Sequence, residues 1–143
     1  MAKILIVEDD QRCSDGISAR LRSEGYEILR AEDPITGIRM AAAHDPHLVM
    51  LEVDLASLGS TQMIEMAREH KSTADIPFIL LSSEEFAGLD QMAADYGACS
   101  FLRTPYQPDE LLETVEAALT LDRDNSLELL FAEGWWESIK EQI

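Results

Sequence analysis

Cysteine, glycine, proline and long apolar runs are all scarce in this chain of 143 residues. Its two cysteines, Cys13 and Cys99, lie far apart and lack the C-x-x-C spacing of a redox or metal site, so we expect buried free thiols. No apolar run approaches the roughly 20 residues of a membrane helix, and no secretory leader is recognisable, which predicts a cytoplasmic protein. Seven glycines and five prolines are too few for a fibrous or low-complexity chain, so we expect an ordinary globular protein.

Basic residues are also scarce. The chain carries 11 lysines and arginines against 28 aspartates and glutamates, a net charge of −17 at pH 7. Such a charge repels the phosphates of nucleic acids and the anionic head groups of membranes. We therefore expect proteins or cations as partners, and neither nucleic acid nor membrane.

Short apolar runs alternate with stretches of helical spacing, which favours βα units and a parallel sheet. The run at residues 4–7 is apolar throughout, as in a strand that is buried on both faces. Asp33 and Pro34 are typical of a helix start, and Gly25 is typical of a helix end. We expect strands at residues 4–7, 26–31, 48–51, 76–81 and 100–102. We expect helices around Ile17 and Leu21 and at residues 34–44, 60–70, 85–95 and 108–121.

Acidic and hydroxyl side chains follow these predicted strands. Glu8 and Asp9 come after the first strand, and Glu52 comes after the third. Ser82 follows the fourth strand, and Thr104 follows the fifth. Parallel α/β sheets bind ligands outside the carboxyl ends of their strands. The sequence therefore predicts one acidic pocket at that edge.

Four segments together have the look of a known family: residues 4–10 (ILIVEDD), 46–52, 76–83 and 97–106. They resemble the receiver domain of two-component response regulators, over residues 3–121. The resemblance implies a flavodoxin-like, doubly wound sheet of five parallel strands in the order 2-1-3-4-5. It also implies transfer of a phosphoryl group from a histidine kinase to an aspartate after the third strand, with Mg²⁺ bound beside it.

Four positions match the functional residues of that family. By the resemblance, Glu8 and Asp9 are the metal-binding acidic pair after the first strand. Ser82 takes the position of the hydroxyl that responds to phosphorylation, and Phe101 takes that of the aromatic side chain that swings on activation. These matches predict that the scaffold of the site is intact.

Two positions depart from the family. The phosphoacceptor position is Glu52 in place of aspartate, and the position of the lysine before a proline is Thr104. Glu52 adds one methylene, and a displacement of about 1 Å can slow a reaction about a hundredfold. Losing a lysine that stabilises charge on the phosphoryl group costs roughly 10²–10³ in rate. These departures predict that stable phosphorylation does not occur.

The three carboxylates of the predicted pocket would repel one another, because no lysine is available to neutralise them. Glu8, Asp9 and Glu52 either bind Mg²⁺ or Ca²⁺ weakly or form a solvated acidic rim, and both interpretations stay open. Arg103 is the nearest cation in sequence, but neighbouring strand residues point to opposite faces, so it is expected to lie away from Thr104. No cofactor is required in this interpretation.

Residues 122–143 lie beyond the receiver pattern and predict a C-terminal helical extension to a domain at residues 1–121. Trp135 and Trp136 point about 100° apart on a helix, so at least one should be buried. They pack either against the domain or against a partner, which includes a second copy in a homodimer.

The sequence therefore predicts an atypical receiver that acts as a phosphorylation-independent protein-interaction module in signal transduction, and not an enzyme. Its expected partners are signalling proteins, either a histidine kinase or an output protein. One alternative is a working receiver that is phosphorylated on Glu52 or Asp54. A second alternative is a metal-dependent phosphatase that uses the acidic pocket, because Glu52 and Asp54 have the spacing of a D-x-D motif.

Overall fold

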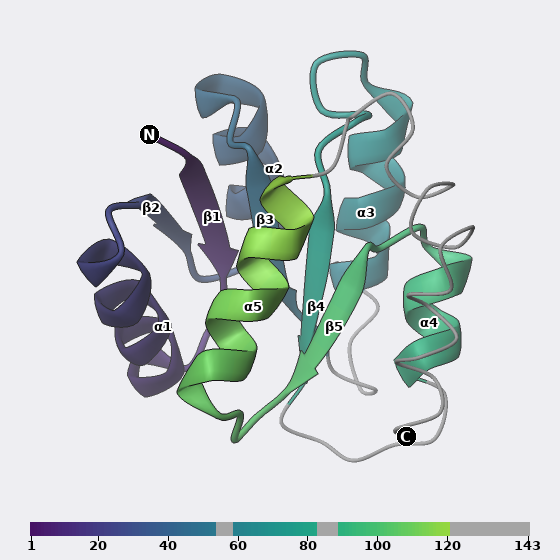
Figure 1. Ribbon diagram of the computed structural model, residues 1–143. Coiled ribbons are helices and arrows are strands. Elements are labelled where there is room, and N and C mark those ends of the chain that lie inside the picture. The colour runs from purple at the N-terminus through teal and green to yellow at the C-terminus, as the bar shows by residue number, and fades with distance from the viewer. Residues whose placement is uncertain (54–58, 83–88, 121–143) are drawn as a thin grey trace.

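Five strands and five helices alternate along residues 1–53, 59–82 and 89–120, the parts of the chain that a computed structural model describes (Figure 1). The alternation confirms the predicted α/β class. None of the described helices is long and apolar enough to cross a membrane. The strands are β1 (Lys3–Val7), β2 (Glu27–Ala31), β3 (Leu48–Glu52), β4 (Phe78–Ser82) and β5 (Ser100–Arg103). The helices are α1 (Gln11–Ser23), α2 (Pro34–His44), α3 (Gly59–Glu69), α4 (Leu89–Asp95) and α5 (Pro108–Leu119).

The strands form one parallel sheet in the order β2-β1-β3-β4-β5, which confirms the predicted doubly wound order 2-1-3-4-5. Val7 at the end of β1 is paired with Ala31 of β2 and with Leu51 of β3. Glu52 at the end of β3 is paired with Leu81 of β4. Because the strands end close to the same level, the loops that follow them meet along one side of the sheet. We call this side the carboxyl edge.

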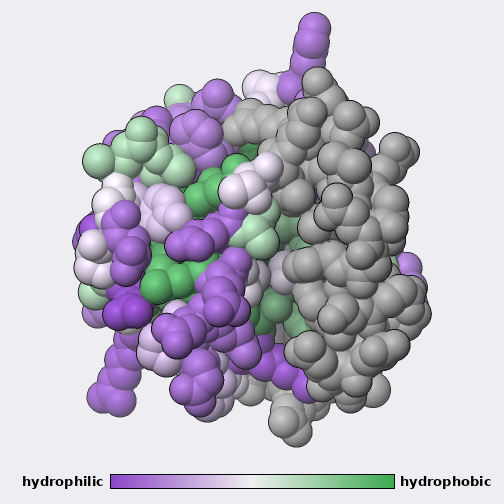
Figure 2. All heavy atoms as spheres, in the orientation of Figure 1, coloured by the Kyte–Doolittle hydropathy of each residue, from purple (hydrophilic) through white to green (hydrophobic). Residues whose placement is uncertain are grey.

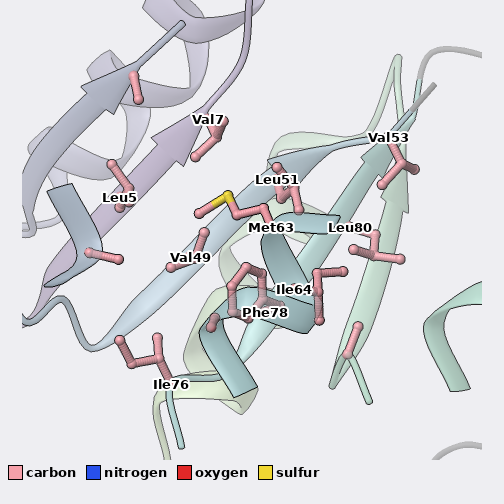
Figure 3. Packing of buried hydrophobic residues seen from close by; sticks show 14 of the residues in the cluster. Leu5, Val7, Val49, Leu51, Val53, Met63, Ile64, Ile76, Phe78 and Leu80 are labelled. Atoms are coloured by element: carbon pink, nitrogen blue, oxygen red, sulfur yellow. The ribbon is translucent and has the colours of Figure 1, made fainter. Parts of the chain in front are cut away.

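Helices cover both faces of the sheet (Figure 1). α1 and α5 share one apolar cluster with the strands, and α2, α3 and α4 share the other. In the second cluster, Met63 and Ile64 of α3 lie over β3 and β4 (Figure 3). Burial on both faces explains why β3 and β4 carry no polar residue before their last positions and why β1 is apolar after Lys3. Hydrophilic residues dominate the described surface over α1 and α5 (Figure 2).

Short polar residues begin the first two helices. The Asp10 carboxylate accepts hydrogen bonds from the backbone N–H groups of Arg12 and Cys13, which fixes the start of α1 at the carboxyl edge. The Asp33 carboxylate accepts from the backbone and the hydroxyl of Thr36, and Pro34 is the first residue of α2, as predicted. Gly25 follows α1 with a φ of 94°, which confirms its predicted role at the helix end.

The predicted position of the fourth strand is wrong by one to two residues at each end. The strand was expected at residues 76–81, whereas β4 runs over Phe78–Ser82. The N–H of Ile76 donates instead to the carbonyl of Thr73 in a turn, and Pro77 has no N–H to give to a sheet. At the other end of β4, Ser82 is paired with Arg103 of β5, so it is the last residue of the strand and not the first of the loop.

Some predictions fall outside the described residues. The expected helix at 85–95 is described only as α4, since residues 83–88 are outside the description. Asp54 lies in one further segment of that kind, and the extension with Trp135 and Trp136 lies in another. Their structures remain predictions.

Arg68 connects three segments on the α3 face of the sheet. Its Nη1 donates to the carbonyls of Ala74 and Ile76 at 2.9 and 2.7 Å, and its Nη2 donates to the carbonyl of Gly97 at 3.2 Å. The guanidinium also stacks over the ring of Phe78, with 5.2 Å from its carbon to the ring centroid. Arg68 therefore holds α3 to the chain before β4 and to the turn before β5.

Candidate functional site at the carboxyl edge

Backbone hydrogen bonds place the acidic residues where the strands end. The N–H of Glu8 donates to the carbonyl of Ala31 at 3.0 Å, which continues the β1–β2 pairing by one residue. Glu8 is only 4% exposed, and its Oε1 accepts from the N–H of Asp10 at 3.1 Å. At the end of β3, the Ser60 hydroxyl donates to the carbonyl of Glu52 at 2.6 Å. The start of α3 is thus attached to the strand that carries Glu52.

Glu8, Asp9 and Glu52 come together as predicted. One carboxylate oxygen from each lies within 4.8 Å of the other two. They belong to a cavity of about 160 Å³ that opens beside the start of α2, which we call the acidic pocket. Its lining residues are Val7, Glu8, Asp9, Glu32, Asp33, Pro34, Glu52 and Ser60.

The proximity of these carboxyl groups changes their protonation. Burial, together with the contacts that Glu52 makes with Asp9 and Glu8, raises the pKa of Glu52 to about 8. Burial also raises the pKa of Glu8, although its hydrogen bond from the backbone of Asp10 opposes the shift. Without a cation, the pocket therefore retains a proton near neutral pH.

No lysine or arginine lines the acidic pocket within the described part of the chain. Arg103 and Thr104 follow each other at the end of β5, and Thr104, not Arg103, lines the second cavity at this edge. This agrees with the expectation that the two side chains point to opposite faces. The hydroxyl of Thr104 donates to the carbonyl of Ser82 at 3.3 Å. Thr104 thus provides a hydroxyl and no charge.

The second cavity, of about 70 Å³, lies between the acidic residues and α1. Ser82 and Thr104 line this second cavity and not the acidic pocket, so the single pocket predicted at this edge is divided into two cavities that share Glu8 and Glu52. Cys13, which was not among the predicted site residues, also lines the second cavity. Cys99 is a buried free thiol as expected, but Cys13 is only partly buried. Burial and the nearby carboxylates raise the pKa of the Cys13 thiol to about 12, so it stays protonated and unreactive at neutral pH.

Other residues of the site were also missed. Glu32, Asp33 and Ser60 line the acidic pocket, although they are not among the predicted site residues. Asp33 is expected only as a helix start, and Ser60 only as the first residue of the helix at 60–70, whereas the starts of α2 and α3 both lie beside the acidic pocket. Phe101 is partly buried on β5, against the apolar cluster of α2, α3 and α4. It lines neither of the two cavities.

The donor set suits a hard cation. Three carboxylate oxygens lie within reach of one another, and the described lining of the acidic pocket contains no cysteine or histidine. This donor set matches the ligands that Mg²⁺ and Ca²⁺ prefer. A bound cation would neutralise the mutual repulsion of Glu8, Asp9 and Glu52. The same carboxylates could also accept a lysine or arginine from another molecule.

The family model described as the response regulator receiver domain matches residues 4–116. The chain therefore belongs to the response regulator receiver domain family, and the resemblance seen in the sequence is confirmed. This family serves signal transduction, generally as signalling modules rather than as enzymes.

Relatives of different lengths match the chain. The DNA-binding dual master transcriptional regulator RpaA of Synechocystis is 33% identical over an alignment that covers 83% of this chain and 49% of RpaA. Protein PilH of Pseudomonas aeruginosa is 27% identical over 83% of this chain and 98% of its own length. The transcriptional regulatory protein PdtaR of Mycobacterium tuberculosis is 28% identical over 99% of this chain and 66% of its own. The chain thus spans about half of one such relative and nearly all of another.

Solved structures share the fold. The chemotaxis protein CheY4 of Vibrio cholerae superposes with a TM-score of 0.76 at 24% identity, over 83% of this chain and 99% of that one. A CheY-like receiver domain from Methanospirillum hungatei gives 0.74 at 24% identity, over 83% and 94% of the two chains. At this identity the likeness shows the fold alone, and it agrees with the sheet order found here.

Proposed function

We propose that this chain is an atypical receiver that acts as a protein-interaction module without being phosphorylated. The single observation that carries the proposal is the identity of two residues at the carboxyl edge. Glu52 ends β3 where the family has its acceptor aspartate, and Thr104 follows β5 where the family has its lysine. The supporting scaffold of Glu8, Asp9 and Ser82 is retained around them.

Physical chemistry explains why these two changes matter most. Phosphoryl transfer depends on placing the acceptor oxygen in line and on stabilising charge on the transferred group. The longer Glu52 side chain displaces that oxygen, and its raised pKa leaves it protonated and poorly nucleophilic near neutral pH without a metal ion. Thr104 cannot supply the missing positive charge. Both requirements are therefore weakened at once.

A glutamate at this position can partly imitate a phosphorylated aspartate. It places a carboxyl group beyond the usual position, and that group carries one negative charge once its proton is lost to a bound cation or to a rise in pH, whereas a phosphoryl group carries about two charges and three acceptor oxygens. We infer that binding of signalling proteins, a histidine kinase or an output protein, is the function of this chain. By the family resemblance, Ser82 and Phe101 contribute to the surface that such partners contact.

A divalent cation is compatible with this function but not required by it. Glu8, Asp9 and Glu52 would hold Mg²⁺ or Ca²⁺, which would supply positive charge to the pocket. Glu52 must lose its proton for this, so the cation binds in competition with protons. We expect weak binding.

The decisive experiment is intact-mass analysis after incubation with a small-molecule phosphodonor and Mg²⁺. We expect no added phosphoryl group on the wild-type chain. A stoichiometric adduct would overturn the proposal and favour a working receiver, and peptide mapping would then assign it to Glu52 or Asp54. Steady release of phosphate from a phosphomonoester would instead favour the metal-dependent phosphatase.

A gain-of-function variant tests the physical explanation. Glu52→Asp combined with Thr104→Lys should become phosphorylated, because the acceptor is shortened and the charge restored. Each single variant is the matched control and should react more slowly than the pair. If the double variant keeps its circular dichroism spectrum but is still not phosphorylated, the lack of phosphorylation is not caused by these two residues alone, and the explanation is contradicted.

A further inference from the structure

An apolar groove lies between α2 and α3 on the side of the sheet opposite α1 and α5. The cavity measures about 280 Å³, and its apolar lining consists of Pro34, Ile35, Ile38, Met63 and Met66. Ile35 is 67% exposed and Met66 is 46% exposed. Among the described residues, only Met1 joins them as a large exposed apolar side chain. Such a groove is typical of a surface that binds another protein.

Close packing of the two helices forms the groove. Gly37 of α2 faces β1 and α3, and a Cβ atom there would lie 2.9 Å from Cγ2 of Val7 and 3.1 Å from Cε of Met63. The missing side chain lets α2 approach the sheet, so Met63 becomes the floor of the groove and Ile35 and Met66 its exposed walls. Two packed helices with an apolar furrow between them are suited to receive a third helix.

The groove continues into the acidic pocket. Asp33 and Pro34 line both cavities, so the apolar surface and the carboxylates of Glu8, Glu32 and Glu52 form one continuous surface. No lysine or arginine lines either cavity within residues 1–53, 59–82 and 89–120. The surface is therefore apolar at one end and negatively charged at the other.

We propose that this surface binds an amphipathic helix of a partner protein that carries a lysine or arginine beside its apolar face. The apolar face would fill the groove, and the basic side chain would reach into the acidic pocket next to Asp33. This inference deepens the proposed function, since it names the partner chemistry for a receiver that lacks its own lysine at position 104. The partner's cation would neutralise the carboxylates that the chain leaves unneutralised.

Charge decides between a partner and a second copy of this chain. A symmetric dimer would place the same surface on both sides, so neither acidic pocket would receive a lysine or arginine from the described lining, and each chain carries a net charge of −17. A basic helix instead gains from the same field as it approaches and as it docks. The occupant that fits both ends of the surface is a basic, amphipathic helix.

The test begins with selection of binders by the full chain from a display library of helical peptides of about four turns. We expect enrichment of peptides with apolar residues at i, i+3 or i+4, and i+7, and a lysine or arginine at one end. Enrichment of peptides without a cation, or no enrichment at all, would overturn the proposal.

Variants of the chain then locate the binding site of a selected peptide by fluorescence anisotropy. Ile35→Ala with Met66→Ala should weaken binding at least about tenfold, because both side chains are exposed walls of the groove. Leu112→Ala on α5, a partly buried residue on the other face of the sheet, is the matched control and should bind unchanged. Equal losses in the groove variant and the control would contradict the assignment.

A second pair of variants tests the charged end. Glu32→Gln with Asp33→Asn removes two charges while asparagine keeps the cap of α2. Replacing the lysine or arginine of the peptide by glutamine should weaken its binding to the wild-type chain several-fold. The same replacement should weaken binding to this variant less, because the peptide cation and the two carboxylates contribute to binding together. Absence of such coupling would overturn the proposed contact.

Sedimentation of the chain alone separates the remaining outcome. If the wild-type chain forms a dimer and the double variant Ile35→Ala with Met66→Ala is a monomer, the groove serves self-association. This result would overturn the partner proposal. None of these measurements depends on phosphorylation. A phosphoryl adduct in the earlier mass experiment would thus overturn the proposed function while peptide binding at the groove could still be observed.

Discussion

Arg68 and the acidic pocket are two concentrations of charge with opposite arrangements. The guanidinium of Arg68 donates to three backbone carbonyls and stacks over Phe78, so most of its hydrogen-bonding capacity is used within the chain. Glu8, Asp9 and Glu52 lie together without a cation beside them in the described chain, and the pKa of Glu52 rises to about 8. The charge of Arg68 is bound by groups of the same chain, whereas the acidic pocket requires a proton, a metal ion or a second molecule.

The comparison separates structural charge from functional charge. A charged group that is fully hydrogen-bonded stabilises the fold, and removing it leaves its partners unsatisfied. A cluster of like charges costs stability in the folded state, and removing one member lowers that cost. The two regions should therefore respond to substitution with opposite signs.

Arg68→Ala should have the largest effect. Three carbonyls lose their donor in a partly buried place, and we expect a loss of about 2–4 kcal/mol in the free energy of unfolding. Urea denaturation measures it. Arg20→Ala, an exposed arginine on α1, is the matched control and should change stability by less than about 0.5 kcal/mol. A similar small change for Arg68→Ala would remove the contrast between the two regions.

Glu52→Gln should act in the opposite direction. The folded protein holds a proton on Glu52 up to a pKa of about 8, whereas the ordinary value of this group is 4.5. Between these values the folded state binds more protons than the unfolded state, so this group lowers stability as pH rises and its full cost is reached above the folded pKa. The variant should be more stable than wild type by at least about 1 kcal/mol near pH 9, since one pKa unit corresponds to about 1.4 kcal/mol.

Urea unfolding from about pH 5 to about pH 9, in the presence of a chelator, measures this difference. Glu113→Gln, an exposed position on α5, is the matched control and should not alter the slope. The raised pKa of Glu52 would be contradicted if the free energy of unfolding of the wild type rose with pH over this range and both variants showed the same pH dependence.

Mg²⁺ should sharpen the comparison by a smaller amount. Millimolar Mg²⁺ should raise the free energy of unfolding by about 1 kcal/mol near pH 9 and by less near pH 6, because the cation competes with the proton on Glu52. Chelation should reverse the gain. Asp9→Asn removes one donor oxygen and should abolish most of it, whereas an equal gain in that variant would place the cation elsewhere.

The surface ion pair between Arg30 and Asp15 should give the smallest effect. Its nitrogen and oxygen lie 2.7 Å apart, but the Asp15 side chain is 64% exposed. Solvent screening limits such pairs, and Asp15→Asn should cost less than about 0.5 kcal/mol at moderate salt. Urea denaturation measures the change in the free energy of unfolding. A loss as large as that of Arg68→Ala would show that the distance between the charged atoms governs their contribution to stability, and not their burial or the number of their hydrogen bonds.

Much of the fold could be predicted from the sequence because the strands and helices differ in apolar period. Residues 4–7 and 48–51 are apolar throughout, and Asp33 with Pro34 marks the start of α2. The order of the strands came from the family resemblance, since periodicity does not specify which strands pair. The boundary of β4 was misplaced because the apolar residue Ile76 precedes Pro77, and only the turn to Thr73 shows that the sheet has not yet begun.

The site residues that follow strands could be predicted from the sequence, whereas those that lie at the starts of helices could not. Glu8 and Glu52 follow buried strands, so their meeting at the carboxyl edge could be inferred. Cys13 and Ser60 reach the site because of how α1 and α3 begin. The Asp10 cap sets the start of α1, and the hydrogen bond from the Ser60 hydroxyl to the carbonyl of Glu52 sets the start of α3. Arg68 carries no sequence signal, because its three carbonyl partners are spread over residues 74–97.

The cap of α2 gives the surface a negative charge that mild acidification does not remove. Asp33 accepts hydrogen bonds from the backbone and the hydroxyl of Thr36, and these lower the pKa of its carboxyl group. In a mildly acidic compartment or buffer Glu52 is neutral, while Asp33 remains ionised between the groove and the pocket. A ligand that pairs with Asp33 would therefore keep its orientation as the surrounding medium becomes acidic.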